Sequence, residues 1–259
     1  MTIRRTVYSG VLVAFYAFAF LALPTAAHAT VVAQHTGAAD PTTEGWFASG
    51  PFVNVATGAV FNDNGSGFDA WMVDDNSTSS LGVYSRNVSA GEVATGTSSG
   101  WTMSSNLRVI DTPGGSIVND GSPSISYRDG SKSWQMHFET TVGGLNVFLL
   151  TNVGVAGHTI SVSGSADDYH LYELIFDSAD GKADLFIDGA LAFSDYEGAN
   201  LVSAANISFG TGSTATLGQG NYNTVSLEVD TAVVPEISSW LIFAAGLVGL
   251  GAVRRRLSA

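Results

Sequence analysis

The sequence predicts an all-β body, an antiparallel β-sandwich, with a short apolar helix expected at each end of the chain. Between positions 30 and 233 no segment keeps the 3.6-residue apolar period of an amphipathic helix. Alternation of apolar and polar residues, the period of a half-buried strand, recurs instead. The chain contains 30 glycines, and its many Ser, Thr, Asn and Asp residues suit turns between short strands. We therefore expect one domain over 30–233.

The N-terminal 29 residues have the organisation of a secretory signal peptide. Arg4 and Arg5 precede an apolar run over 11–23. Ala27 and Ala29 then provide the small residues of an A-x-A cleavage pattern. We expect cleavage after Ala29 and export of the remaining chain.

Strand patterns are clearest in the second half of the body. Two Asp-Gly pairs, at 129–130 and 188–189, separate alternating runs, and this dipeptide is a strong hairpin signal because both residues tolerate positive φ. The second pair belongs to a predicted three-stranded meander over 169–193. The predicted strands are 124–127, 134–139, 145–150, 158–163, 169–176, 183–187, 190–193, 206–210 and 224–229. Turns at this spacing favour a sandwich or jelly roll.

The meander also carries a family resemblance. Residues 169–198 read YHLYELIFDSADGKADLFIDGALAFSDYEG. This run resembles the concanavalin A-like and laminin-G-like jelly rolls, where an aromatic-rich strand leads through a loop to an apolar strand ending in Asp-Gly. That superfamily includes lectins, adhesion modules and glycoside hydrolases, so the resemblance implies a fold and leaves the function open.

The body is strongly acidic. Five of the ten basic residues lie in the terminal segments, so the body carries five basic residues against 22 acidic ones, a formal charge of −17. Nucleic acid is therefore excluded as a partner, because phosphate contact needs a basic surface. The chain has no cysteine, which excludes disulfides, thiol nucleophiles and thiolate metal sites.

Catalytic patterns are missing from the sequence. Two carboxyl groups that hydrolyse a glycosidic bond lie about 5–9.5 Å apart. Glu173 with Asp177, and Asp184 with Asp188, are each four residues apart, about 13 Å along one strand. No serine lies in a G-x-S-x-G elbow, and no H-E-x-x-H spacing occurs. We therefore expect no catalytic residues and no enzyme.

Two kinds of ligand site remain as hypotheses. Oxygen-rich loops suggest calcium as the one cofactor to consider, with weak candidate ligands at Asp63, Asp69, Asp177 and Asp180. Turn formation explains the same residues without a metal. Three tryptophans in polar, glycine-rich surroundings are candidates for stacking on sugars, although tryptophans of a sandwich also belong in its core. They are Trp46, Trp71 and Trp101.

The C-terminal segment 234–259 has three parts in a fixed order. The motif Val234-Pro235-Glu236 precedes an apolar run over 240–253, which starts at Trp240. The cluster Arg254, Arg255 and Arg256 follows and favours retention on the cytoplasmic side. The run spans about 21 Å as a helix, short for a bilayer core of about 30 Å.

This order resembles the PEP-CTERM sorting signal of Gram-negative bacteria. Ile237 departs from the family pattern, which has proline there. The resemblance implies processing by an exosortase, insertion in the inner membrane, and a role in species that produce exopolysaccharide and biofilm. The alternative is an ordinary C-terminal membrane anchor.

Together these observations predict an exported protein, anchored in the membrane facing the periplasm or released to the cell surface or extracellular matrix. Its sandwich is expected to bind or organise extracellular polysaccharide without catalysis. The first alternative is a glycoside hydrolase or lyase of the concanavalin-like superfamily. The second is a structural matrix protein with no discrete ligand.

Overall fold

The computed structural model describes residues 29–50, 52–76, 81–112, 123–152, 155–163, 168–211 and 217–231. They belong to one compact unit, Ala29–Thr231. Residues 1–28 of the predicted signal peptide and both flanking helices lie outside these residues, whereas Ala29, the predicted cleavage residue, is the first described residue and begins a strand. Ala27, the motif Val234-Pro235-Glu236, and the anchor residues Trp240 and Arg254 to Arg256 also lie outside the described residues. No helix within the described ranges is long and apolar enough to cross a membrane.

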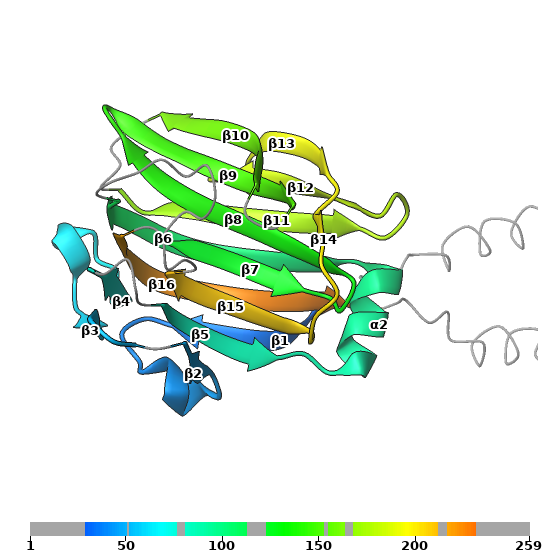
Figure 1. Cartoon of the computed structure of the whole chain (residues 1–259), viewed down its shortest axis with the longest axis horizontal. Helices are drawn as coiled ribbons and strands as arrows, with labels where there is room; N and C mark the ends of the chain where they lie inside the picture. The colour runs from blue at the N-terminus through cyan, green and yellow to red at the C-terminus, as the bar shows by residue number, and fades with distance from the viewer. Residues whose placement is uncertain are drawn as a thin grey trace, which may run out of the picture. The chain divides into compact units, whose positions relative to one another are not determined.

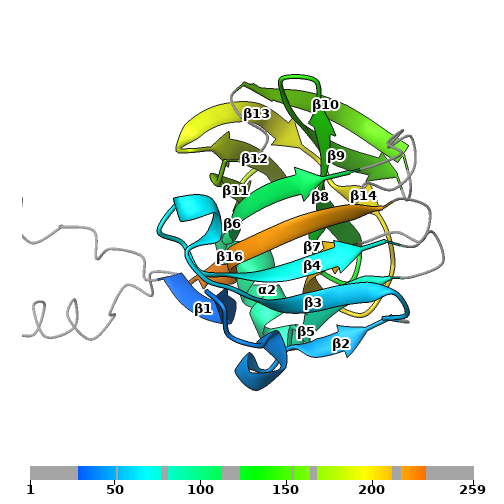
Figure 2. The same ribbon diagram turned by 90° about the vertical axis from the view of Figure 1, so that its left-hand side faces the viewer.

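Two antiparallel sheets, A and B, pack face to face, which confirms the predicted β-sandwich (Figures 1 and 2). Sheet A has the order β13 (Ala190–Tyr196), β12 (Lys182–Ile187), β11 (His170–Asp177), β6 (Trp101–Asp111), β16 (Gly218–Asp230), β4 (Ala70–Asp75) and β3 (Val55–Val60). Strand β1 (Ala29–Thr36) pairs with the second half of β16, beyond the part that pairs with β4.

Sheet B has the order β10 (Val155–Ser163), β9 (Gly144–Asn152), β8 (Lys132–Thr141), β7 (Ser124–Arg128), β15 (Asn206–Thr211), β5 (Gly82–Asn87) and β2 (Phe47–Ser49). The short strand β14 (Ala199–Asn200) pairs with β8. Membership of a particular jelly-roll family remains a prediction.

The predicted strands of the second half are all present. Strands β11, β12 and β13 form the expected meander, with β12 between the other two. Its tight turn places Asp188 at φ 52° and Gly189 at φ 77°. These positive values are the reason that an Asp-Gly pair occurs there.

One helix contradicts the prediction of a body without helices. Helix α2 (Ala90–Ser99) lies at one end of the sandwich (Figure 1). A capping box starts it: the Ser89 amide donates to Glu92 Oε2 at 2.7 Å, and the Glu92 amide donates to Ser89 Oγ at 3.3 Å. Gly96 is buried, and a Cβ there would lie 3.2 Å from Val229 of β16. A helix this short and polar has no apolar period for the sequence to show.

Large aromatic side chains fill the space between the sheets. Trp101 of sheet A stacks on Phe176 with ring centroids 5.2 Å apart, and packs edge-on against Trp134 of sheet B at 5.3 Å. Trp134 in turn contacts Tyr196 at 5.5 Å. Burial of rings of this size dominates the stability of a sandwich core.

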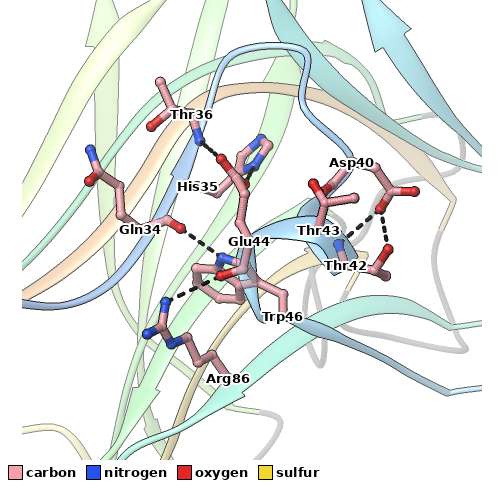
Figure 3. A network of polar contacts seen from close by, with 9 residues as sticks. All are labelled: Gln34, His35, Thr36, Asp40, Thr42, Thr43, Glu44, Trp46 and Arg86. Carbon is pink, nitrogen blue, oxygen red and sulfur yellow. Dashed lines mark hydrogen bonds and ion pairs between the residues drawn. The ribbon is translucent and has the colours of Figure 1, made fainter.

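A polar strap joins the two sheets between β1 and β2 (Figure 3). It contains the short 3-10 helix η1 (Pro41–Glu44). His35, with no exposed surface, contacts Glu44 through Nδ1 at 2.6 Å. Trp46 Nε1 donates to the Gln34 carbonyl at 2.9 Å, and Arg86 of β5 donates to the Glu44 carbonyl at 3.4 Å. These contacts fix β2 against the edge of sheet B.

Candidate functional site

A polar groove lies on the face of sheet B that points away from the core. Ile125 and Tyr127 of β7 are buried in the core, so Ser124, Ser126 and Arg128 alternate to the opposite face. The groove encloses a cavity of about 210 Å³. Its lining consists of Ser49, Leu81, Val83, Ser85, Ser124, Ser126, Arg128, Gln135, His137, Asn206 and Ser208.

The strand register arranges this lining in three rows across the sheet. In the middle row, Ser126 is opposite Gln135 on one side and Ser208 on the other, and Ser208 is opposite Ser85. The side chains of the row are small at its centre, which hollows the face.

Each of the two outer rows contains one large side chain, Arg128 or His137. Arg128 lies between Ser133 and Asn206 in one, and Ser124 lies between His137 and Gly210 in the other. Rows two residues apart along a strand are separated by about 6.6 Å. The groove therefore has an arginine end, a serine floor and a histidine end.

Hydrogen bonds hold the floor in place. Ser126 Oγ and Ser208 Oγ are 2.7 Å apart, and His137 Nε2 is 3.1 Å from Gln135 Oε1. Gln135 Nε2 donates to Ser133 Oγ at 2.5 Å. These five side chains face away from the core, yet each residue is no more than 8% exposed. The groove is thus a recessed polar surface with fixed hydroxyl and amide groups.

Two polar atoms of the groove are left without a partner. Arg128 Nε and Asn206 Oδ1 are both buried, and neither has a hydrogen-bond partner. They lie on directly opposite residues of β7 and β15. A buried donor and a buried acceptor without partners therefore lie at the same end of the groove.

The weak calcium candidates lie elsewhere. Asp63, in the 3-10 turn η2 (Asp63–Gly65), accepts from Arg108 at 2.6 Å, from Asn221 at 2.7 Å and from the Tyr169 hydroxyl at 2.9 Å. Burial opposes its ionisation, but the hydrogen bonds from Asn221, Arg108 and Tyr169 outweigh burial and hold the pKa of Asp63 below its ordinary value. Asp63 is therefore already neutralised by protein groups.

The other three candidates shape turns. Asp69 accepts from the Asn62 amide at 2.9 Å, Asp177 from the Ala179 amide at 2.7 Å, and Asp180 from the Lys182 amide at 3.0 Å. Within the described ranges no three acidic, histidine or cysteine side chains form a group that could hold a metal. Calcium binding stays a prediction from the sequence.

The tryptophan candidates for sugar stacking are corrected by the structure. Trp46, Trp71 and Trp101 are 3%, 8% and 2% exposed, so none offers a ring face to a ligand. The exposed aromatic residues near a polar loop are Phe61, at 71%, and Phe68, at 40%, and the Phe68 ring lies 5.0 Å from that of Tyr169. Phe61 and Phe68 form a second candidate surface for ligand binding, and an experiment can compare it with the groove.

Sequence reasoning missed the groove because its residues look like an ordinary solvent-facing side of a strand. Alternation in 124–128 and 206–209 shows which side chains share a face. It does not show that these two segments, 82 positions apart at Ser126 and Ser208, are neighbours in one sheet. The pairing of β7 with β15 creates the site.

Comparison with known proteins relates the chain to carbohydrate enzymes. No family model matches it. Sialidases from two strains of Vibrio cholerae serotype O1 are 28% identical to it over 204 residues, which covers 75% of this chain. The chain spans 23% of the length of these relatives.

Solved structures share the fold. A carbohydrate esterase from the Shiga toxin-encoding bacteriophage phi24B superposes with a TM-score of 0.60 at 15% identity, over 79% of this chain and 100% of the other. A protein of unknown function from Shewanella oneidensis MR-1 superposes with a TM-score of 0.50 at 8% identity, over 84% and 94%. At these identities the likeness concerns the fold alone.

The expectation that the protein is not an enzyme is thereby overturned. Its sequence relatives are named sialidases, and they are 28% identical to the chain over 204 residues, a match that covers 75% of the chain. These findings support a carbohydrate-related β-sandwich and point toward a carbohydrate-active enzyme.

Proposed function

We propose that the chain provides the substrate-recognising sandwich of a carbohydrate-active enzyme, and that the groove of sheet B receives the glycan. The observation that carries this proposal is the recessed floor of Ser126 and Ser208, flanked by Gln135 and His137. A hydroxyl both donates and accepts, as does an amide side chain, so such a floor matches the donor and acceptor groups of a sugar.

The size of the groove suits a small part of a glycan. Its cavity of about 210 Å³ is smaller than the range of about 300–1,000 Å³ that is typical for sites of drug-sized ligands. The groove therefore holds one terminal or branching unit, with the rest of the glycan outside it.

Cleavage within the groove would need a mechanism other than a carboxyl pair. Among the described residues that line it there is no Asp or Glu. The group that can transfer a proton near neutral pH is His137, and Ser124 lies directly opposite on β7. Because the match covers 23% of the sialidases, their bond-cleaving groups need not belong to the matched part.

A glycan array with the full-length protein, scored for binding and for released sugar, tests this proposal. The decisive variant is Ser126→Leu, which fills the floor and should lower binding at least tenfold. Its matched control is Ser104→Leu on the outer face of sheet A, where Ser104 and Ser226 form an equivalent hydroxyl pair at 2.8 Å.

The control variant should bind as the unchanged protein does. No binding to any glycan, or equal binding by both leucine variants, contradicts the proposal. Release of sugar that is lost in His137→Ala would place the reaction in this groove, whereas release that persists in this variant places it elsewhere in the protein.

We also propose export and C-terminal sorting, supported by the terminal segments of the sequence. Mass spectrometry of the protein from a host with an exosortase should find the chain shortened at both ends. Replacing Pro235 and Glu236 by alanine should leave 234–259 attached and the protein in the membrane fraction. Retention of 234–259 in the unchanged protein would contradict processing.

A further inference from the structure

We infer that the sugar unit held in the groove carries a carboxylate, and that Arg128 binds it. This inference rests on the proposed function, because it names the class of sugar for the same groove. Arg128 is the one arginine or lysine among the described lining residues, which include no acidic side chain. The groove thus has a positive end within a body of formal charge −17.

The other basic side chains of the body all have protein partners. Arg108 pairs with Asp63 at 2.6 Å, and Arg86 donates to the Glu44 carbonyl at 3.4 Å. Lys132 donates to the Glu197 carbonyl at 2.7 Å, and Lys182 pairs with Asp195 at 3.5 Å.

Arg128 differs from these four residues. Within the described ranges its guanidinium makes no hydrogen bond or ion pair, and its Nε is buried. Among the five basic residues of the body, a side chain without a hydrogen bond or ion pair to a described residue is the exception. Arg128 is nevertheless partly exposed and lines the groove, so the other nitrogens of its guanidinium are the groups that a ligand oxygen would contact.

The serine floor narrows the class of ligand. Ser126 and Ser208 both donate and accept hydrogen bonds, and they lie in the row next to Arg128. A carboxylate accepts from a guanidinium with good geometry but has no hydroxyl to donate to the floor. A sugar acid has a carboxylate and hydroxyls on one ring, so it can contact Arg128 and the floor together. A simple anion lacks the hydroxyls, and a neutral sugar lacks the charge.

The rows of the groove then set the orientation of the ring. The carboxylate lies at the arginine end, and the ring extends over Ser126 and Ser208, about 6.6 Å along the strands. The remaining glycan leaves past the histidine end. Arg128 is in this arrangement a specificity-determining residue and not part of the hydroxyl floor.

Calorimetric titration of the full-length protein with matched sugars tests the inference. The pairs are 3′-sialyllactose with lactose, and glucuronate with glucose, with sodium acetate as a simple anion. A charge-assisted hydrogen bond contributes about 1.5–3 kcal/mol, so the acidic member of at least one pair should bind about tenfold or more tightly. Comparison of the two pairs distinguishes a sialic acid from a uronic acid as the source of the carboxylate.

Substitutions assign the preference to one side chain. Arg128→Gln should abolish the preference for acidic sugars and should change the affinity for neutral sugars by no more than about twofold. Arg128→Lys should keep part of the preference, because it keeps the charge but loses the planar fork. Arg86→Gln, on strand β5 of the same sheet, is the matched control and should keep all of the preference.

Results that contradict this inference differ from the result that contradicts the proposed function. Equal binding of acidic and neutral sugars overturns this inference and leaves the proposed groove intact. A preference that survives Arg128→Gln also overturns it. Acetate that competes as well as a sugar acid shows an anion site without sugar recognition, which overturns it too. Absence of binding to every sugar overturns the proposed function itself.

Discussion

The outer faces of the two sheets each have a recessed polar cluster built around one arginine, and the clusters differ in what the arginine contacts. On sheet A, Arg108 is paired with Asp63, which Asn221 and Tyr169 also contact. On sheet B, Arg128 lies among serines and amides and has no partner in the described structure. The hydrogen bonds of the first cluster hold the η2 turn. The arginine of the second cluster remains available to a ligand.

The difference separates a structural site from a recognition site. In the Asp63 cluster the ionised groups neutralise each other, so nothing is gained by adding a ligand. In the groove, Arg128 is partly exposed and has no hydrogen bond or ion pair to a described residue, so its guanidinium remains available to a ligand. Stability should therefore depend on the first cluster and ligand binding on the second.

The largest expected effect is a loss of protein stability when the Asp63 cluster is broken. Asp63→Ala removes the carboxylate that lies 2.6 Å from Arg108, whose side chain is 11% exposed. Removing one partner of a buried pair costs about 3–5 kcal/mol. Urea unfolding should show this loss in the free energy of unfolding. A loss below about 1 kcal/mol would mean that the cluster is not structural, since surface pairs contribute about that little.

The next largest effect is on the stability of the protein at low pH. Because the pKa of Asp63 is lower in the folded protein than the ordinary value of 3.8, its contribution to stability is fully present above that value. It is lost as the pH falls from there through the folded pKa. Unfolding measured between pH 5 and pH 2 should therefore show a shallower acid decline in Asp63→Asn than in the unchanged protein. Parallel declines would contradict this role of Asp63.

The smallest effect is expected from Arg128 when stability is measured without ligand. Arg128→Ala removes no hydrogen bond or ion pair of the described structure, so the free energy of unfolding should change by no more than about 0.5 kcal/mol. A gain in stability fits the account as well, because the substitution removes an unsatisfied donor. A loss of 2 kcal/mol or more would show that Arg128 is structural and would remove the contrast between the two clusters.

The sequence predicts the local elements of this fold far better than their neighbours in space. Alternation and the Asp-Gly pair at 188–189 were sufficient for the strands of the second half. Helix α2 was not predicted, because its start signal, Ser89 with Glu92, precedes a segment without an apolar face. The burial of Trp101 depends on Phe176, Trp134 and the facing sheet, which no local pattern contains.

The groove shows the same limit more sharply. Each of its rows combines residues of at least three strands, and the rows exist only because β15 returns to pair with both β7 and β5. Arg108 pairs with Asp63, whereas Arg128 has no carboxylate partner among the described residues. No sequence pattern distinguishes these two arginines, and the contrast is visible only in three dimensions.

The most direct test of the central claim is a backbone amide chemical-shift map of the isotopically labelled protein, titrated with the acidic sugar that binds best. We predict that the largest shifts are at Ser126, Arg128, Asn206 and Ser208, with the Asp63 cluster and the loop of Phe61 and Phe68 unchanged. Shifts centred on that loop, with the groove unchanged, would contradict the account.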